Sequence, residues 1–160
     1  MLYKMLIRRL KQDSESAIYR STVRSSDLFA RIVLMKRQIL VVDDEAGART
    51  LIAIMLERGG FAVLKADGAR EALEVLDQHD PDLIILDVMM PGMDGIELCQ
   101  TIRGRDATSK TPVLILSARG DAQSIIRGIE AGANDYLQKP ILHNDLVAKV
   151  RSMLGVGVEA

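Results

Sequence analysis

From Gln38 onward, short aliphatic runs alternate with longer segments in which apolar residues recur every three or four positions. Continuous apolar runs are typical of parallel strands covered on both faces, whereas the longer spacing is typical of amphipathic helices. The runs predict strands at 39–42, 61–64, 83–86 and 113–116, with a weaker fifth at 135–137. Five strand–helix units predict an α/β fold. Because crossovers are right-handed, we expect a doubly wound parallel sheet with helices on both faces.

The intervening segments predict five helices, each with one apolar face. Helix-terminal signals agree with them: Gly59 and Gly60 follow the first helix, Gly132 follows the fourth, and Asp94 with Glu97 predicts a capping box opening the third. The expected apolar faces consist of Leu51, Ile54 and Met55; Ala69, Ala72, Leu73 and Leu76; Gly95, Leu98, Cys99 and Ile102; Ala122, Ile125, Ile126 and Ile129; and Leu146, Val147, Val150, Met153 and Leu154.

Composition narrows the class of protein. The chain has 160 residues, of which 48% are hydrophobic and 27% charged, as expected of a globular domain. Its single cysteine, Cys99, excludes an internal disulfide and suits a reducing cytoplasm. No apolar run approaches the roughly 20 residues of a membrane-spanning helix. We therefore expect a cytoplasmic protein without a membrane span.

Charge is distributed unevenly along the chain. Residues 1–37 contain nine Lys or Arg and three Asp or Glu, a net charge of +6, whereas residues 38–160 contain twelve and nineteen, a net charge of −7. An acidic domain has no general attraction for a nucleic acid backbone. Only Phe61 and Tyr136 could stack on bases after residue 37. Direct nucleic acid binding is therefore not expected.

The two ends of the chain carry less information. Residues 1–37 form a basic N-terminal extension, for which three interpretations stay open: a membrane-surface or partner-binding segment, a disordered segment, or an artefact of a start site that truly lies at Met35. Residues 155–160 read as a short tail. Because no output domain follows the fifth helix, we expect the protein to act by docking.

Acidic residues follow two of the predicted strands. Asp43 and Asp44 come after the first strand and Asp87 after the third. In a doubly wound sheet, ligands bind at the carboxyl ends of the strands, so these acids are expected to converge. Carboxylates about 4 Å apart repel by roughly 4 kcal/mol per pair at an effective dielectric near 20. Such a cluster needs a cation, and oxygen ligands without His or Cys favour Mg2+.

Two further polar residues belong to the same edge. Ser117 ends the fourth strand, and Lys139 follows the fifth. Since Mg2+ binds phosphate oxygens, the edge can receive a phosphoryl group, with Asp87 as the nucleophile that forms an aspartyl-phosphate. Lys139 supplies a second positive charge, and Ser117 a hydrogen-bond donor.

Four motifs in order give the chain a resemblance to a known family. They are LVVDDE at 40–45, LDVMMPGMDG at 86–95, LSA at 116–118 and DYLQKP at 135–140. With these motifs, residues 38–154 resemble the receiver domain of two-component response regulators, over about three-quarters of the chain. The resemblance implies a flavodoxin-like, five-stranded parallel sheet with strand order 2-1-3-4-5.

The resemblance also implies a role for each matching residue. Asp87 would accept a phosphoryl group from a histidine kinase or phosphotransfer protein. Asp44, Asp87 and the backbone carbonyl of Met89 would bind Mg2+ directly, and Asp43 would hold it through water. Lys139 would contact the phosphoryl group, and its bond to Pro140 would be cis. Ser117 and Tyr136 occupy the family's switch positions.

The predicted function is a phosphorylation-dependent signalling switch whose chemistry is limited to its own phosphorylation and dephosphorylation. A downstream protein would bind the face formed by the fourth helix, the fifth strand and the fifth helix. A phosphorylation-dependent dimer is a further expectation. An intermediate carrier in a phosphorelay is an alternative. A Mg2+-dependent aspartyl-phosphate hydrolase is disfavoured, because it expects a second Asp two residues after the nucleophile, where Met89 stands.

Overall fold

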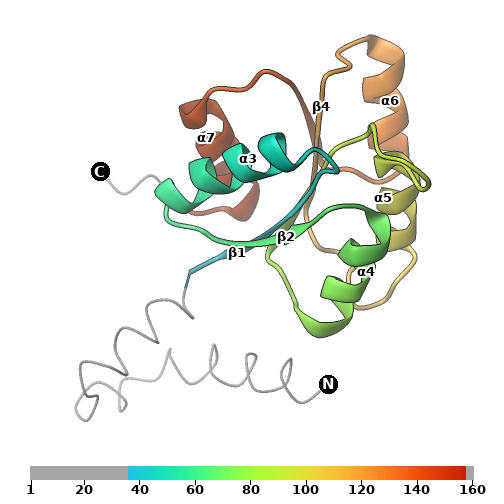
Figure 1. Cartoon of the computed structure of the whole chain (residues 1–160), viewed down its shortest axis with the longest axis horizontal. Helices are drawn as coiled ribbons and strands as arrows, with labels where there is room; N and C mark the ends of the chain where they lie inside the picture. The colour runs from blue at the N-terminus through green and yellow to red at the C-terminus, as the bar shows by residue number, and fades with distance from the viewer. Residues whose placement is uncertain (1–35, 158–160) are drawn as a thin grey trace.

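The computed structural model describes residues 36–157 of the chain, so the predictions for residues 1–35 and 158–160 lie outside the described part. Five parallel strands form one sheet in the order β2-β1-β3-β4-β5, and helices cover both of its faces (Figure 1). The predicted fold class and strand order are confirmed. Within the described residues, no helix combines the length and the apolar character needed to cross a membrane.

Strands and helices alternate along the whole described chain. The elements in chain order are β1 (Gln38–Val42), α3 (Ala46–Arg58), β2 (Ala62–Ala66), α4 (Ala69–Gln78), β3 (Leu83–Leu86), α5 (Gly95–Arg103), β4 (Val113–Ser117), α6 (Ala122–Glu130), β5 (Asp135–Gln138) and α7 (His143–Leu154).

The three central strands are almost completely buried. All residues of β3 and β4, and all of β1 after Gln38, are buried, whereas the edge strands β2 and β5 are mostly half-buried. A central strand of a parallel sheet faces helices on both sides, which explains its continuous apolar run. The weaker apolar pattern at 135–137 belongs to an edge strand.

Alternate strand residues contribute to two separate cores. Leu40, Ile84 and Ile115 face the core beneath α4, α5 and α6, whereas Ile85 and Leu114 face the core beneath α3 and α7. Figure 1 shows α3 and α7 together on one side of the sheet. Because successive side chains of a strand point to opposite faces of the sheet, this alternation determines toward which helix layer each side chain points, including those at the strand ends.

Two of the five predicted apolar faces are not the faces that the helices bury. In α3 the buried residues are Ile52, Ala53 and Leu56, while Leu51 and Ile54 are 54% and 42% exposed. The helix is apolar on two sides, and of the predicted face only Met55 packs partly against the core beneath α3.

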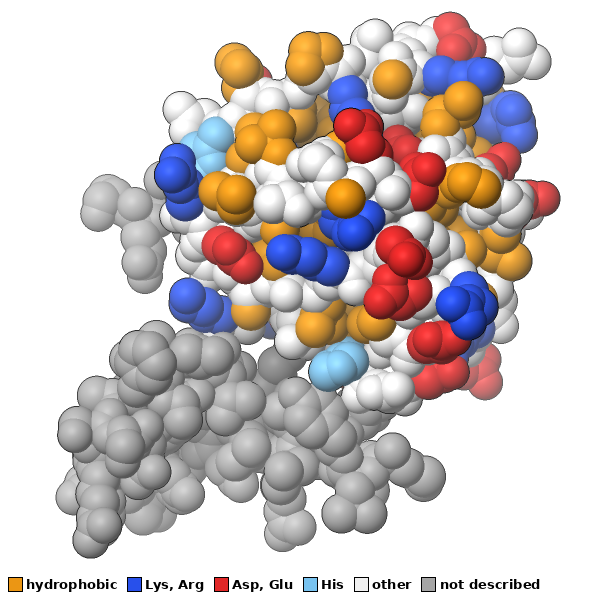
Figure 2. Space-filling model, viewed as in Figure 1, with side chains coloured by type: hydrophobic (Ala, Val, Ile, Leu, Met, Phe, Trp, Pro, Cys, Tyr) orange, Lys and Arg blue, Asp and Glu red, His pale blue; other side chains and the backbone are white. Residues whose placement is uncertain are grey.

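The second difference concerns α6. Its predicted apolar face is exposed, and its one buried residue is Gly128. A Cβ at Gly128 would lie 2.8 Å from the Ile115 side chain and 3.1 Å from the Tyr136 ring. Because Gly128 has no side chain, α6 packs closely against the sheet at this position, and its isoleucines face outward. In Figure 2 exposed apolar side chains lie between charged ones of both signs.

Local signals for helix ends are confirmed. Asp94 caps α5 and forms a capping box with Glu97. Gly60 and Gly132 follow α3 and α6 with φ of +91° and +105°, a backbone conformation that favours glycine.

Arg103, the last residue of α5, ties three segments together. Its guanidinium donates to the carbonyl of Gly132 at 2.8 Å, to that of Thr111 at 2.6 Å and to the side chain of Asn134 at 2.8 Å. Gly132 and Asn134 lie between α6 and β5, and Thr111 precedes β4. The C-terminal end of α6 is thereby fixed to α5 and to the base of the sheet.

Candidate functional site

Asp87 stands at the carboxyl end of β3, the central strand of the sheet. Its backbone amide donates to the carbonyl of Val42 at 2.9 Å, which continues the β1–β3 ladder by one residue past Leu86. The side chain is 9% exposed, so it lies at the bottom of an opening rather than on the outer surface. Gly95 contacts this backbone so closely that a Cβ there would lie 2.1 Å from the Asp87 carbonyl oxygen.

Asp43 and Asp44 reach the same place from β1. The carboxylate of Asp43 is buried and accepts a hydrogen bond from the amide of Glu45 at 2.9 Å, while Asp44 is exposed. One oxygen each of Asp43, Asp44 and Asp87 lies within 4.8 Å of the others. The predicted convergence of the three acids is present, and their all-oxygen donor set fits a hard divalent cation. Glu45 is the N-cap residue of α3 and makes no side-chain capping bond.

Lys139 completes the cluster from β5. Its ammonium group lies 2.7 Å from Asp43 Oδ2 and 3.4 Å from Asp87 Oδ1. Its amide donates to the Ser117 carbonyl at 2.8 Å, and its peptide bond to Pro140 is cis. Burial alone would lower the pKa of Lys139, but the hydrogen bond that Lys139 donates to Asp43 and the charge of Asp87 outweigh it and raise the pKa. Lys139 therefore stays cationic between the two carboxylates.

Asp87 is held in an environment that disfavours its charge. Burial raises the pKa of Asp87, the ammonium of Lys139 lowers it, and the charges of Asp43 and Asp44 raise it again, with a net rise. An additional cation at the cluster would favour the ionised carboxylate, which is the form that acts as a nucleophile.

The two predicted switch residues lie beside the cluster and are linked through one loop. Ser117 is fully buried, and its hydroxyl accepts a hydrogen bond from the amide of Arg119 at 3.2 Å. Tyr136 is half-buried, and its hydroxyl donates to the carbonyl of Arg119 at 2.6 Å. Arg119 therefore connects Ser117 to Tyr136 through its own backbone.

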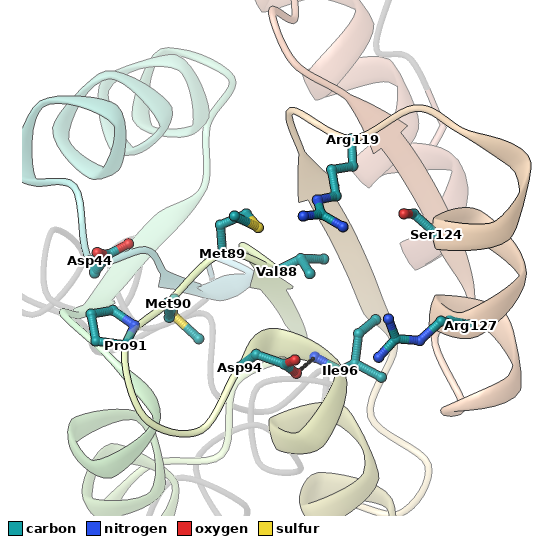
Figure 3. Close-up of a pocket in the computed structure, with 10 residues that line it drawn as sticks. All are labelled: Asp44, Val88, Met89, Met90, Pro91, Asp94, Ile96, Arg119, Ser124 and Arg127. Atoms are coloured by element: carbon teal, nitrogen blue, oxygen red, sulfur yellow. Dashed lines mark hydrogen bonds between the residues drawn. The ribbon is translucent and has the colours of Figure 1, made fainter.

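A groove of about 410 Å3 opens beside the acids, between the loop after β3 and α6 (Figure 3). Met89, which is 54% exposed, stands on one side with Asp44. On the other side are Arg119, Ser124 and Arg127. Ser124 and Arg127 are absent from the sequence-based prediction. Their spacing of three residues places two polar groups on the same side of α6, but only the packing of α6 shows that this side faces the site.

Comparison with known proteins agrees with this geometry. The family model of the response regulator receiver domain matches residues 39–151. The chain is 40% identical over 121 residues to the phosphate regulon transcriptional regulatory protein PhoB of Pseudomonas aeruginosa, covering 76% of this chain and 53% of that protein. It is 43% identical over 117 residues to the transcriptional regulatory protein ResD of Bacillus subtilis, covering 73% and 48%.

Solved structures show the same fold. A putative response regulator from Chloroflexus aurantiacus is 38% identical, with a TM-score of 0.72, and the match covers 75% of this chain and 98% of that one. The chemotaxis protein CheY4 of Vibrio cholerae is 30% identical, with a TM-score of 0.71, covering 74% and 98%.

These matches and the acidic cluster define a receiver of the two-component class. The chain belongs to the family of response regulator receiver domains. Members of this family are signalling switches rather than enzymes that turn over a substrate. The chain spans about half the length of the curated relatives it matches.

Proposed function

We propose that this protein is a cytoplasmic switch that accepts a phosphoryl group on Asp87 from a histidine kinase or phosphotransfer protein. The observation that carries the proposal is the arrangement around Asp87: Asp43 and Asp44 within 4.8 Å and the ammonium of Lys139 at 3.4 Å. The partly buried carboxylate of Asp87 thus has two further carboxylates, those of Asp43 and Asp44, as possible ligands for a cation, and the positive charge of Lys139 beside it.

The donor set fits Mg2+. Asp44, Asp87 and the backbone carbonyl of Met89 would be direct ligands, and Asp43 would act through water. When bound, Mg2+ supplies positive charge to the phosphoryl oxygens. The residues themselves do the remaining work: Asp43 orients Lys139 through its 2.7 Å contact, and Lys139 contributes a donor to a phosphoryl oxygen.

The proposed transfer forms a bond between a carboxylate oxygen of Asp87 and phosphorus, while the bond from phosphorus to the donor nitrogen breaks. The ionised carboxylate is the nucleophilic form, because a protonated carboxyl group is a much weaker nucleophile. Burial raises the pKa of Asp87 in the protein alone. A bound cation would favour the ionised carboxylate, so cation binding is expected to promote phosphoryl transfer to Asp87.

The phosphoryl group adds a charge of about −1.5 to −2 at the end of the sheet. We infer that Ser117 exchanges its bond with the Arg119 amide for one with a phosphoryl oxygen. That exchange would shift the 118–121 loop and release Tyr136 from the Arg119 carbonyl. The face built by α6, β5 and α7 would change with it, and a downstream protein or a second copy of the chain would bind there.

A phosphorelay carrier is the second candidate function, and it uses the same site. This function would be favoured if the phosphoryl group stayed on Asp87 long enough to be transferred to another protein. The hydrolase alternative stays disfavoured, because Met89 provides no second carboxylate near the nucleophile. Readout by protein docking rather than by direct nucleic acid contact is consistent with the net charge of −7 over residues 38–160, where twelve basic and nineteen acidic residues lie.

Incubation with acetyl phosphate and Mg2+ tests the proposal. Intact-protein and peptide mass spectrometry should show one phosphoryl group on Asp87, and none in Asp87→Ala or with a chelator present. Asp106→Ala, which removes an exposed carboxylate at the opposite end of the sheet, serves as a control and should be labelled normally. Label on another residue, or rapid turnover of exogenous phosphoesters, would contradict the switch.

A further inference from the structure

Three methionines stand in the loop between β3 and α5, and they differ in exposure. Met89 is 54% exposed, Met93 37% and Met90 8%. The hydroxyl of Thr101 donates a hydrogen bond to the Met93 sulfur at 3.9 Å, whereas no residue within 36–157 donates one to the Met89 sulfur. Met89 is therefore the methionine of this loop whose thioether is most open to reagents in solution.

The remaining sulfur atoms of residues 36–157 are shielded. Met55 and Met153 are half-buried against the core beneath α3 and α7. Cys99 is fully buried, and burial raises the pKa of its thiol, which suppresses the reactive thiolate. In the described part of the chain, a water-soluble oxidant should therefore react first with Met89.

Met89 lies across the groove from two arginines. Met89 and Asp44 line one side of the groove, Arg119 and Arg127 line the other, and Figure 3 shows both guanidinium groups directed into the space between them. Within residues 36–157, neither guanidinium group donates a hydrogen bond or forms a salt bridge, and both side chains are exposed. A thioether is only a weak acceptor, so Met89 offers these donors little to bind.

Oxidation would supply a stronger acceptor. The thioether sulfur gives an electron pair to one oxygen of hydrogen peroxide, the O–O bond breaks, and the second oxygen leaves as water. The sulfur is oxidised and the peroxide is reduced. The product, methionine sulfoxide, is a polar, uncharged side chain whose oxygen accepts hydrogen bonds. Guanidinium groups donate charge-assisted hydrogen bonds, which are stronger than those between neutral groups.

We propose that Met89 is a site of reversible oxidation by peroxides, at which the sulfoxide oxygen binds Arg119 and Arg127 and bridges the groove. The consequence for signalling rests on the proposed role of Asp87 as the phosphoacceptor. A phosphoryl donor approaches from solvent, with its leaving group opposite the attacking carboxylate oxygen. Met89 follows Asp87 by two residues, so a bridge from its side chain stands across this approach and slows phosphorylation. Methionine sulfoxide reductases would restore the thioether and the rate.

Mass spectrometry after treatment with hydrogen peroxide tests the site of oxidation. We expect an added oxygen on Met89 before Met93, and none on Met90 or Cys99 at that stage. Oxidation of Met93 before Met89 would overturn the proposal.

Phosphorylation rates test the effect of the sulfoxide. With phosphoramidate and Mg2+, we expect oxidised wild type to be labelled on Asp87 about threefold or more slowly than unoxidised protein. Treatment with the two methionine sulfoxide reductases should reverse the change. Met93→Leu is the matched control, because it removes the second exposed thioether of the loop and should keep the full effect of peroxide. In Met89→Leu, peroxide should leave the rate of that variant unchanged.

The arginines separate a bridge from a general effect of oxidation. In Arg119→Ala/Arg127→Ala, the ratio of the rates before and after oxidation of Met89 should return to about one. Arg58→Ala/Arg70→Ala removes the same charge outside the groove and should keep the slowing. In the wild type without Mg2+ or donor, oxidation should shift the Nε–H NMR resonances of Arg119 and Arg127.

The outcomes distinguish the modification from the proposed function. Slowing that persists in the Arg119→Ala/Arg127→Ala variant, unshifted arginine resonances, or an unchanged rate in oxidised wild type would overturn the bridge and leave Asp87 as the acceptor. Failure of unoxidised wild type to become labelled on Asp87 would overturn the proposed function as well.

Discussion

At the scale of single residues, the site is a compromise between function and stability. Asp43 and Asp87 are 1% and 7% exposed and lie within 4.8 Å of each other and of Asp44. Lys139 offsets part of the repulsion, but burial still leaves Asp87 with a raised pKa. Buried like charges lower the stability of the folded state, so these carboxylates are expected to destabilise the protein when no cation is bound.

We predict that Asp87→Asn raises the melting temperature when no divalent cation is present. The pKa of Asp87 is higher in the folded state than its ordinary value of 3.8, so ionisation favours the unfolded state. The contribution of Asp87 to stability is greatest below that value and is lost as the pH rises through its folded pKa. The advantage of the variant in melting temperature should therefore grow as the pH rises above about 4.

Mg2+ should reverse the order of the two proteins. At a free concentration ten times its Kd, a cation that binds only the folded state adds about 1.4 kcal/mol. Wild type should gain this increment and Asp87→Asn should gain less, because it lacks one ligand. Thermal melts with and without Mg2+ measure both effects, and Asp106→Asn is the control for loss of an exposed carboxylate. A variant that melts below wild type without Mg2+ would contradict the electrostatic account.

A second residue-scale constraint is the contact between α5 and the backbone of Asp87. A Cβ at Gly95 would lie 2.1 Å from the Asp87 carbonyl oxygen, so Gly95→Ala must displace either the helix or the backbone of Asp87. We expect a loss of about 1–3 kcal/mol in the free energy of unfolding, together with slower labelling of Asp87 by acetyl phosphate.

Gly68→Ala provides the comparison for that variant. Gly68 precedes α4, and a Cβ there would meet no atom within 4 Å. Its free energy of unfolding from urea titration should stay within about 1 kcal/mol of wild type, with unchanged labelling. Equal effects of the two substitutions would show that the close approach at Gly95 has no special importance.

At the scale of secondary-structure elements, α3 has apolar residues on two sides and only one of them packs on the sheet. We predict that Ile52→Ala and Leu56→Ala each cost roughly 2–5 kcal/mol, because both side chains are buried beneath α3. Leu51→Ala and Ile54→Ala, which alter exposed side chains, should each change stability by no more than about 0.5 kcal/mol. Urea unfolding of the four variants distinguishes the buried side from the exposed one.

The same comparison shows what the sequence could predict about the elements. Strands β1, β3 and β4 have continuous apolar runs that no helix spacing explains, and α5 begins at a capping box whose two members are three residues apart. These signals are local, so they are readable without the fold. The buried side of α3 depends on the contacts of this helix with β2 and α7. The buried side of α6 depends on its close contact with the sheet at Gly128, which has no side chain. The intervals between apolar residues alone therefore did not predict which sides are buried.

The site divides in a similar way. Convergence of Asp43, Asp44, Asp87 and Lys139 follows from topology, because parallel strands present their carboxyl ends at one edge of the sheet. The pairing of Lys139 with Asp43 at 2.7 Å, closer than with Asp87, depends on side-chain packing. Arg127 could not be assigned to the site from the sequence, because its position depends on how α6 lies against the loop after β3.

At the scale of the whole molecule, two exposed apolar surfaces lie on different layers. One consists of Leu51 and Ile54 on α3, and the other of Ile125, Ile126 and Ile129 on α6. Only the second belongs to the face that includes Tyr136 through β5. If phosphorylation acts through Ser117 and Tyr136, the α6 surface rather than the α3 surface should change its binding properties.

Self-association tests this distinction. We predict that wild type labelled with acetyl phosphate sediments faster than unlabelled protein, and that Ile126→Asp abolishes the difference without reducing labelling of Asp87. Leu51→Asp is a matched control, because Leu51 and Ile126 are each 54% exposed. Sedimentation velocity measures the three proteins in both states. Loss of the shift in Leu51→Asp, with retention in Ile126→Asp, would assign the interface to α3 instead.

The hydrogen bonds of Arg103 have a mechanical consequence for this surface. They fix the segment after α6 at Gly132, whereas the backbone of Arg119, before α6, accepts a hydrogen bond from Tyr136 and donates one to Ser117. A nine-residue helix is about 13 Å long, so a tilt of about 10° around its anchored end displaces its first turn by about 2 Å. A rotation of α6 about Gly132 would therefore displace its first turn, near Ser124, further than its last turn, near Ile129.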